Sequence, residues 1–361
     1  MDIAVVTGPA GLVGGEAVRV FSTRFDLVVG LGEPPRWDAG EAERLANFRH
    51  HRTDLRDQSA VAEVLRGYGA DVRLVVHTAA HPGTVRPAAD PLPWFGAAAL
   101  STVSLLEAVR AHCPEAVFVL DSTVDVYGDV SKALPFVETP TRWELDPAHP
   151  WHQHGVDESM PLDRADRVFP AVSVLSADLA AQDQGRRYGL NVGVFRSSHV
   201  TAARSAPPGR HGFLSDLVRD AVRGTPFTIR GHGGKQVRDI LDAADLVEMF
   251  WHFYLEPRSG EVYHAGGGRE RGCSILEVIG EYEYLIGREV QFEYSAEPEY
   301  ADLRWWLTDT RRFRRDYPRW RPTRGLSDIL ATTHRYWSEF GRNFPFGANG
   351  ALGLGSASEA L

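Results

Sequence analysis

Three glycines near the start of the chain have the spacing of a phosphate-binding turn. Gly8, Gly11 and Gly14 follow an apolar run at residues 3–7, and apolar residues at helical spacing follow them. Glycine lets a backbone turn sharply and approach a pyrophosphate, and the first amides of a helix attract its charge. We therefore predict a strand, a cofactor-binding turn and a helix here; a glycine-rich turn in another kind of α/β protein is the alternative. The predicted binding residues are Gly8, Ala10, Gly11, Leu12, Val13 and Gly14.

A second group of small residues follows another apolar run. Residues 72–77 are the expected fourth strand, and Thr78, Ala79 and Ala80 come directly after it. Small side chains at the carboxyl end of a buried strand leave room for a ligand, so we predict that these three residues line the same cofactor site.

The elements that would position these residues alternate between strand and helix patterns through the first 200 residues. The 361 residues, 43% of them hydrophobic, can bury a large core. Alternation of this kind predicts an α/β fold: a Rossmann-type doubly wound parallel sheet with a smaller C-terminal α/β substrate lobe. We expect a nucleotide-binding domain at 1–200 with a long loop at 129–170, a substrate-binding lobe at 201–345 partly interleaved with the sheet, and a disordered tail at 346–361.

Composition excludes several classes of protein. A net charge of −9 argues against a nucleic-acid partner, which needs a basic face. The two cysteines, Cys113 and Cys273, lie far apart, as in a reduced protein without a thiol-metal site. No run of about 18 apolar residues predicts a membrane span, and the chain shows no signal peptide, so we expect a cytoplasmic protein.

Several segments together resemble the extended short-chain dehydrogenases of the NAD-dependent epimerase/dehydratase family, which remodel nucleotide sugars. The matching segments are TGPAGLVG (7–14), TDLRD (53–57), VVHTAA (75–80), LLEAVR (105–110), STVDVYGD (122–129) and KQVRDILDAAD (235–245). Within that family, ETPTRW (138–143), GVDESMPLD (155–163) and LRWWLTDTRR (303–312) resemble the CDP-paratose 2-epimerase branch, also called CDP-tyvelose epimerase.

The resemblance implies ligands and an assembly. It implies bound NAD, or NADP, with Asp54 and Leu55 at the adenine, and a nucleotide sugar whose diphosphate meets Arg238 and Arg304; an ion pair with Asp239 or Asp242 is the alternative role of Arg238. His199 is a further candidate near the substrate. It also implies a homodimer through the helices expected at 97–111 and 176–188.

The catalytic pair of that family is absent from this chain. In the family, a Tyr takes a proton from a sugar hydroxyl and a Lys four residues later lowers the pKa of the Tyr. Our alignment places Val174 and Asp178 at these two positions, and shifting it finds only Pro170, Ala171 or Leu175. The chain has two lysines, Lys132 and Lys235, and the residue four positions before each is a glycine. No Tyr-x-x-x-Lys therefore occurs anywhere in the sequence.

Two other family positions also depart from the pattern. Leu31 stands where an acid usually binds the adenosine ribose, and Ala98 stands at about the position of an Asn on the helix after the fourth strand. Glu33, two residues after Leu31, either replaces that acid or is a solvated turn residue.

Other groups must then carry any proton transfer. We name Thr123, Tyr127, His152 and His154 as candidates, with Asp125, Glu158 and His199 as further possibilities; each is a loop or core residue under the simpler interpretation. His152 and His154 have no identifiable third ligand, so we expect no metal site. Three hypotheses stay open: an NAD-dependent enzyme with atypical catalytic residues, a non-redox lyase, dehydratase or cyclase in secondary metabolism, and an inactive nucleotide-binding homologue.

Overall fold

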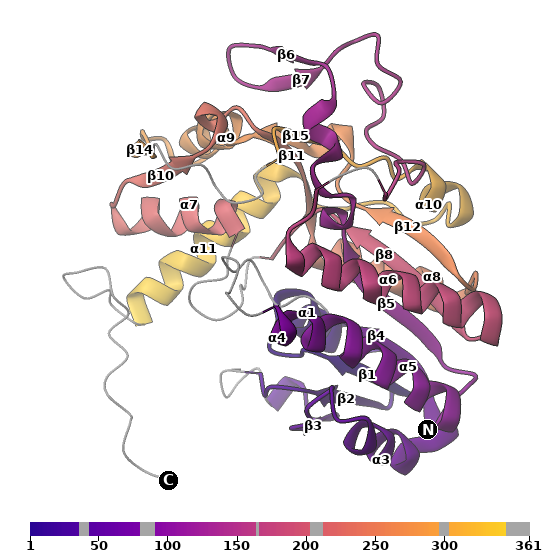
Figure 1. The fold of residues 1–361 in the computed structure, drawn as a ribbon. Helices are drawn as coiled ribbons and strands as arrows, with labels where there is room; N and C mark the ends of the chain where they lie inside the picture. Colours follow the sequence, from indigo (N-terminus) through magenta and orange to yellow (C-terminus); the bar gives the residue numbers. More distant parts are fainter. Residues whose placement is uncertain (36–42, 80–90, 164–165, 203–211, 296–302, 344–361) are drawn as a thin grey trace.

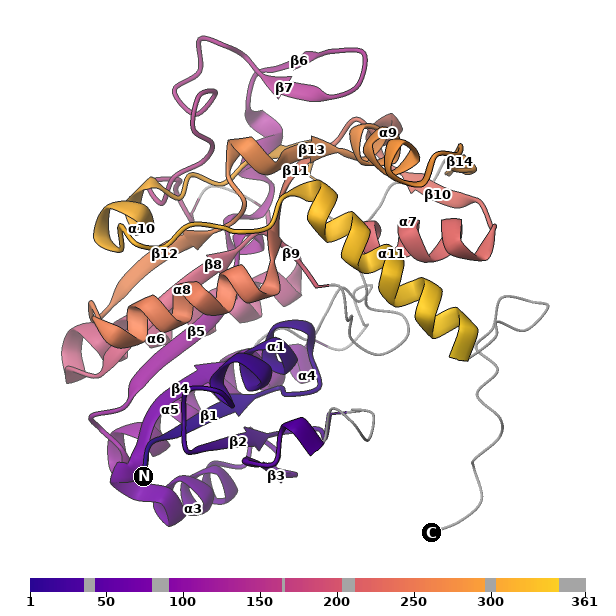
Figure 2. The ribbon, with the colours of Figure 1, turned by 180° about the vertical axis from the view of Figure 1, so that it is seen from behind.

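The computed structural model describes residues 1–35, 43–79, 91–163, 166–202, 212–295 and 303–343. Ala80 and the tail expected at 346–361 lie outside the described residues. Two layers of helices enclose a central sheet, and a smaller lobe lies beyond the carboxyl edge of that sheet (Figures 1 and 2).

The central sheet confirms the predicted fold class. Its seven strands are all parallel, in the order β12-β8-β5-β4-β1-β2-β3. Most of these strands are short, buried apolar runs, as expected for a sheet covered on both faces, whereas the edge strand β3 is largely polar and only partly buried. The strands are β1 (Ile3–Thr7), β2 (Leu27–Leu31), β3 (Phe48–His51), β4 (Val72–His77), β5 (Val117–Thr123), β8 (Asn191–Ser197) and β12 (Glu261–Ala265).

Helices cover both faces of this sheet and build two separate hydrophobic cores. One core joins the sheet to α3 (Gln58–Tyr68), α5 (Ser101–His112) and α6 (Phe169–Tyr188). The other joins the opposite face to α1 (Leu12–Phe21), α8 (Ala243–Leu255) and α10 (Arg311–Asp316). Because β12 is part of this sheet and α8 covers one of its faces, the chain beyond residue 200 returns to the nucleotide-binding half.

The helix expected at 97–111 is longer than predicted. It begins with α4 (Leu92–Phe95), passes through a π-helical segment η2 (Gly96–Leu100) and continues as α5. The stretch Leu92–His112 has a mean hydropathy of 1.4, which would suit a membrane span by length and composition, but 56% of it is buried in the protein. It is a core helix of the fold.

The smaller lobe has its own core of apolar residues. Strands β11 (Val237–Asp242), β13 (Gly272–Ser274), β15 (Trp305–Trp306) and β9 (His199–Thr201) form one sheet, and β10 (Phe227–Arg230) and β14 (Phe292–Ser295) form a parallel pair. The helices of the lobe are α7 (Gly212–Arg223), α9 (Ile275–Ile286) and α11 (Leu326–Asn343). Short 3₁₀ segments are η1 (Gly69–Asp71), η3 (Val124–Ala133), η4 (His232–Gly234) and η5 (Arg269–Arg271).

The long loop predicted at 129–170 contains a hairpin, which we call the arm: β6 (Phe136–Glu138) and β7 (Trp143–Leu145). Figure 1 shows the arm beyond β11 and β15, on the side away from the central sheet. Arg142 ties it to α9 by an ion pair with Glu277 at 2.8 Å, and to β13 by donating to the carbonyl of Gly272 at 2.7 Å. Glu277 is also half of the capping box that starts α9 at Ser274.

Helix α6 begins seven residues earlier than the helix predicted from residue 176. Pro170 lies in its first turn, where proline is well tolerated because the first amides of a helix have no partner within it. This earlier start matters for the active site, because a helix between two parallel strands begins at their carboxyl edge.

Candidate active site

The glycine turn has the geometry of a diphosphate site. Gly8 adopts φ +64°, which favours glycine, and its N–H donates to the carbonyl of Leu31 at 3.0 Å. A Cβ on Gly14 would lie 2.2 Å from the carbonyl oxygen of Gly8, so that position excludes any side chain. Gly11 is exposed at the mouth of the turn, between half-buried Ala10 and Leu12.

The first turn of α1 differs from the starts of three other helices. Asp57, Asp242 and Ser274 cap α3, α8 and α9 with their side chains, whereas Gly11 offers α1 no side-chain cap. Uncapped first amides suit a bound anion, since they and the helix dipole attract negative charge. The turn therefore fits a dinucleotide diphosphate, held by the backbone around Leu12 and Val13.

The adenosine side of this site fits a dinucleotide less well. Leu31 is fully buried and offers no acceptor for a ribose hydroxyl. The carboxylate of Asp54 is exposed and bonded to Arg56 at 2.7 Å, and this hydrogen bond lowers the pKa of Asp54. Leu55 belongs to the core.

A buried histidine holds the end of β4 next to the turn. His77 Nδ1 lies 2.7 Å from the hydroxyl of Thr7, and its Nε2 lies 3.0 Å from that of Thr102. The Thr102 hydroxyl donates to the carbonyl of Ala98, so His77 Nε2 carries the proton and Nδ1 accepts. The Thr7 hydroxyl oxygen also accepts from the amides of Thr78 and Ala79, which fixes both predicted cofactor residues.

An apolar cluster surrounds Val174, the position at which our alignment places the family Tyr. Val174 is 2% exposed and packs in one cluster with Ala98, Val124 and Trp306. Thr123, at the end of β5, accepts a hydrogen bond from the amide of Asp125 at 3.2 Å. Asp125 is exposed.

Asp178 is the centre of a closed, buried network. Its carboxylate receives two hydrogen bonds from Arg196, both 2.9 Å long, one from Ser122 at 2.7 Å and one from Gln182 at 2.6 Å. Asp178 is fully buried and Arg196 is 3% exposed. Although burial opposes the charge, the bonds to Asp178 raise the pKa of Arg196.

This geometry indicates where a Tyr-x-x-x-Lys pair could stand on α6. A lysine at 178 would lie against the guanidinium of Arg196, whereas positions 170 and 174 lie in the first two turns, nearer the carboxyl edge. We therefore favour Pro170 and Val174, rather than Val174 and Asp178, as the equivalents of the family Tyr and Lys. The chain lacks the pair in either alignment.

Tyr127 takes part in the same network. Its phenol accepts from Arg196 at 2.8 Å and lies 2.6 Å from Nε2 of His264. His264 Nδ1 donates to the carbonyl of Val156, so its Nε2 accepts the phenol proton. Burial raises the pKa of Tyr127 to about 12 and lowers that of His264 to about 4. A neutral phenol with both hydrogen-bonding functions occupied is a poor general base.

The other catalytic candidates lie in the loop before α6. His152 and His154 are half-buried, and none of the interactions of the described residues joins either ring to Thr123 or Tyr127. Glu158 accepts from the amide of His264 at 2.8 Å, and burial raises its pKa. Among the described residues, no group of three or more His, Cys, Asp or Glu side chains could hold a metal ion.

The predicted arginines Arg238 and Arg304 lie on neighbouring chain segments, since the carbonyl of Arg304 accepts from the amide of Val237 at 3.1 Å. Arg238 is 7% exposed on β11. Desolvation by the surrounding protein lowers the pKa of His199, and the positive charge of Arg238 lowers it further. Arg304 lies under the arm, with its guanidinium 4.6 Å from the ring centre of Trp143 and 5.5 Å from that of Phe136. No interaction among the described residues joins the two arginines.

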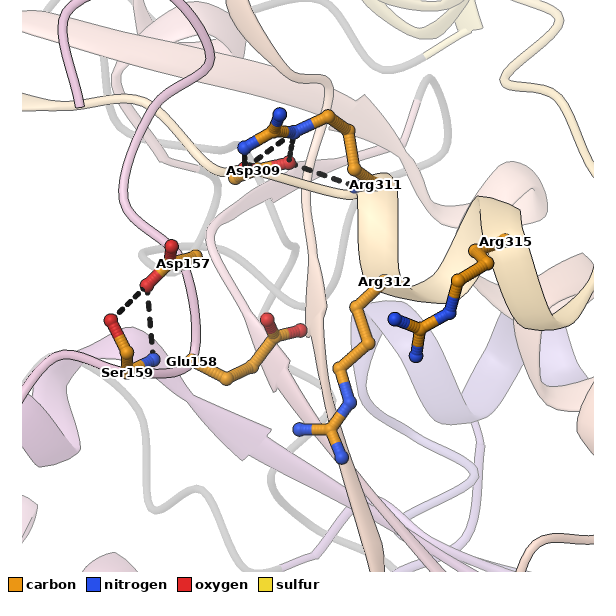
Figure 3. A pocket seen from close by; sticks show the side chains of 7 residues that line it. All are labelled: Asp157, Glu158, Ser159, Asp309, Arg311, Arg312 and Arg315. Atoms are coloured by element: carbon orange, nitrogen blue, oxygen red, sulfur yellow. Dashed lines mark hydrogen bonds and ion pairs between the residues drawn. The ribbon is translucent and has the colours of Figure 1, made fainter. Parts of the chain in front are cut away.

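A separate pocket of about 760 Å³ lies where the loop before α6 meets α10 (Figure 3). Its arginines are paired within the protein, Arg311 with Asp309, Arg312 with Glu261 and Arg315 with Asp316. Such pairing leaves little net charge for a ligand. The pocket lining is Asp157, Glu158, Ser159, Asp309, Arg311, Arg312 and Arg315.

Sequence reasoning missed Arg196, His264 and His77 as members of the site. One signal was available for Arg196 and His77: each is a polar residue at the end of a buried apolar strand, where a charge or an imidazole needs a partner. Their partners could not be identified, because Arg196 meets a residue on a helix and His264 meets one 137 positions away.

Known proteins share this architecture. Residues 4–266 match the model of the NAD dependent epimerase/dehydratase family. CDP-paratose 2-epimerase of Salmonella typhi is 28% identical over 303 residues, which cover 80% of this chain and 86% of that protein.

Two solved structures have the same fold. The UDP-glucose 4-epimerase of Thermotoga maritima, with UDP-glucose, has a TM-score of 0.76 and 20% identity, covering 94% of this chain and 99% of that one. The dTDP-glucose 4,6-dehydratase of Bacillus anthracis, in complex with NAD, has a TM-score of 0.71 and 20% identity, covering 94% and 97%.

Proposed function

Because the chain belongs to the NAD-dependent epimerase/dehydratase family, we propose that it is a nucleotide-sugar-modifying member with atypical catalytic residues, acting on a CDP-sugar or another nucleoside-diphosphate sugar. NAD, when bound in this family, accepts and returns a hydride. The uncapped start of α1 and the exposed Gly11 support a diphosphate at this turn. The similarity to CDP-paratose 2-epimerase supports the CDP-sugar class.

The observation that carries the atypical site is the closed Asp178–Arg196 pair beside the apolar cluster at Val174. No phenol and ammonium can meet there, in either alignment. General base catalysis typically contributes a factor of about 100 to 10,000, so oxidation of a sugar hydroxyl should be slower by roughly that factor than in a family member with the pair.

Proton transfer must then use the groups that remain. Thr123 with the exposed Asp125 offers one hydroxyl and one carboxylate at the end of β5, and His152 and His154 offer imidazoles. Tyr127 is the weakest of the four candidates, because its phenol is buried and shared between Arg196 and His264.

The test begins with the purified chain. We expect it to bind CDP-sugars, and to form reduced nicotinamide on addition of a CDP-sugar only slowly, if supplied with NAD. Thr123→Val and Asp125→Asn should abolish that remaining turnover, while His252→Gln, on the distant α8, should leave it unchanged. Absence of nucleotide-sugar binding would contradict the proposal.

A second candidate is a non-redox enzyme or an inactive binding protein on the same scaffold. Three apolar residues at family polar positions favour it: Leu31 and Ala98 are fully buried, and Val174 is 2% exposed. Turnover of a nucleotide sugar without NAD would support the non-redox enzyme, and tight binding without any turnover would support the binding protein.

A further inference from the structure

An exposed ion pair lies at the carboxyl ends of two neighbouring strands. Glu33 follows β2 and Arg52 follows β3, with 3.8 Å between Glu33 Oε2 and Arg52 Nη2. The two side chains are 75% and 78% exposed. Because β2 and β3 are parallel and adjacent, both residues emerge at the edge of the sheet that carries the glycine turn.

The backbone before Glu33 is fixed next to that turn. The amide of Gly8 bonds the carbonyl of Leu31, and the amide of Gly32 bonds the carbonyl of His51 at 3.2 Å. The ring of His50 donates from Nε2 to the carbonyl of Gly32 at 2.9 Å. Gly32 itself adopts φ +114°, which favours glycine and turns the chain so that Glu33 projects into solvent.

The adenosine ribose of a dinucleotide is attached directly to its diphosphate. With the diphosphate at the first amides of α1, the ribose must therefore lie near the end of β2, where dinucleotide-binding folds place an acid. Leu31 offers no acceptor there. Glu33 is the first carboxylate after the strand, and an exposed ion pair contributes only about 0–1 kcal/mol, so its carboxylate can readily exchange Arg52 for a hydroxyl.

We propose that the Glu33 carboxylate exchanges Arg52 for the 2′-hydroxyl of the adenosine ribose, takes the place of the acid missing at Leu31, and so selects NAD over NADP. This inference rests on the proposed function, because it requires the dinucleotide to bind. A 2′-phosphate would approach the Glu33 carboxylate and be repelled. Without that carboxylate, the guanidinium of Arg52 would be unpaired at the same place and could bind the phosphate.

The test measures dissociation constants of NAD and NADP by isothermal titration calorimetry. For the unmodified chain we expect NAD to bind at least tenfold more tightly than NADP. Glu33→Gln should weaken the binding of NAD about tenfold and strengthen that of NADP about tenfold, a change within the range of hydrogen bonds to charged groups. Adding Arg52→Gln to that variant should remove the gain for NADP.

Glu63→Gln, an exposed carboxylate on α3, is the matched control and should change neither constant. All these side chains are exposed, so thermal melting should show that the variants fold. This inference would be overturned if Glu33→Gln left the NAD dissociation constant unchanged, or if the unmodified chain preferred NADP. Neither result would count against nucleotide-sugar binding. Binding of CDP-sugars without any NAD or NADP would overturn it too, whereas loss of CDP-sugar binding would count against the proposed function.

Discussion

Two places along one edge of the sheet differ in how they meet a ligand. At β1 and α1, main-chain amides remain without side-chain caps around an exposed glycine. At β5, α6 and β8, side chains close on one another, with Asp178 and Arg196 buried and Val174 in an apolar cluster. The first place is suited to binding, and the second resembles the interior of the protein.

The difference teaches that binding and proton transfer depend on different parts of the chain. Amides belong to every residue except proline, so a phosphate turn needs only glycines and a helix start. A general base needs one particular side chain with an adjusted pKa. Substitutions can therefore remove the catalytic side chains of such a fold while its nucleotide-binding site remains.

The largest test replaces the acid of the closed region. Asp178→Lys places an ammonium against Arg196 in a fully buried position, and breaking a buried pair costs about 3–5 kcal/mol. We expect at least that loss in the free energy of unfolding, measured with urea. Asp183→Lys, on the same helix but in an exposed pair with Arg187, is the control and should cost less than about 1 kcal/mol. Equal losses would show that the closed region is ordinary surface.

The next test uses pH. Burial lowers the pKa of His264 to about 4 from an ordinary value near 6.5, so the unfolded chain binds the proton more tightly. Stability from this group is therefore fully present above about pH 6.5 and falls as the pH drops toward 4, by up to about 3 kcal/mol. We expect His264→Gln to flatten that part of the profile of unfolding free energy against pH. An unchanged slope would mean that His264 is charged in the folded protein.

A third test tries to reopen the closed region. Pro170→Tyr with Val174→Lys puts phenol and ammonium on the first two turns of α6 and leaves Asp178 with Arg196. We expect at least tenfold more reduced nicotinamide on addition of a CDP-sugar than in the unmodified chain. The comparison pair, Val174→Tyr with Asp178→Lys, should instead lose stability. A gain from the second pair and none from the first would show that our choice of positions is wrong.

The smallest effect concerns the outer surface of the same helices. Leu100 is 52% exposed on η2 and Leu179 is 50% exposed on α6, and we expect both to be covered in a homodimer. Leu100→Asp with Leu179→Asp should give a monomer by light scattering. Because neither side chain is in the core, the unfolding free energy of the monomer should change by less than about 0.5 kcal/mol. Leu255→Asp, 59% exposed at the end of α8, is the control and should leave the dimer intact.

Much of the sheet and the glycine turn could be predicted, because short apolar runs and glycine spacing are local signals. The start of α6 was predicted too late, since Pro170 was taken as part of a loop although proline is favoured in a first helical turn. The Asp178–Arg196 pair could not be predicted. It depends on how the helix α6 packs against the strand β8, and the number of residues between them does not determine that packing.

The ion pair between Arg142 and Glu277 couples the arm to the start of α9. Glu277 accepts from three partners at once: Thr141 and Arg142 of the arm, and the amide of Ser274, the N-cap of α9. Lifting the arm would thus also loosen the beginning of that helix, so movement of the hairpin should be coupled to fraying of the first turn of α9.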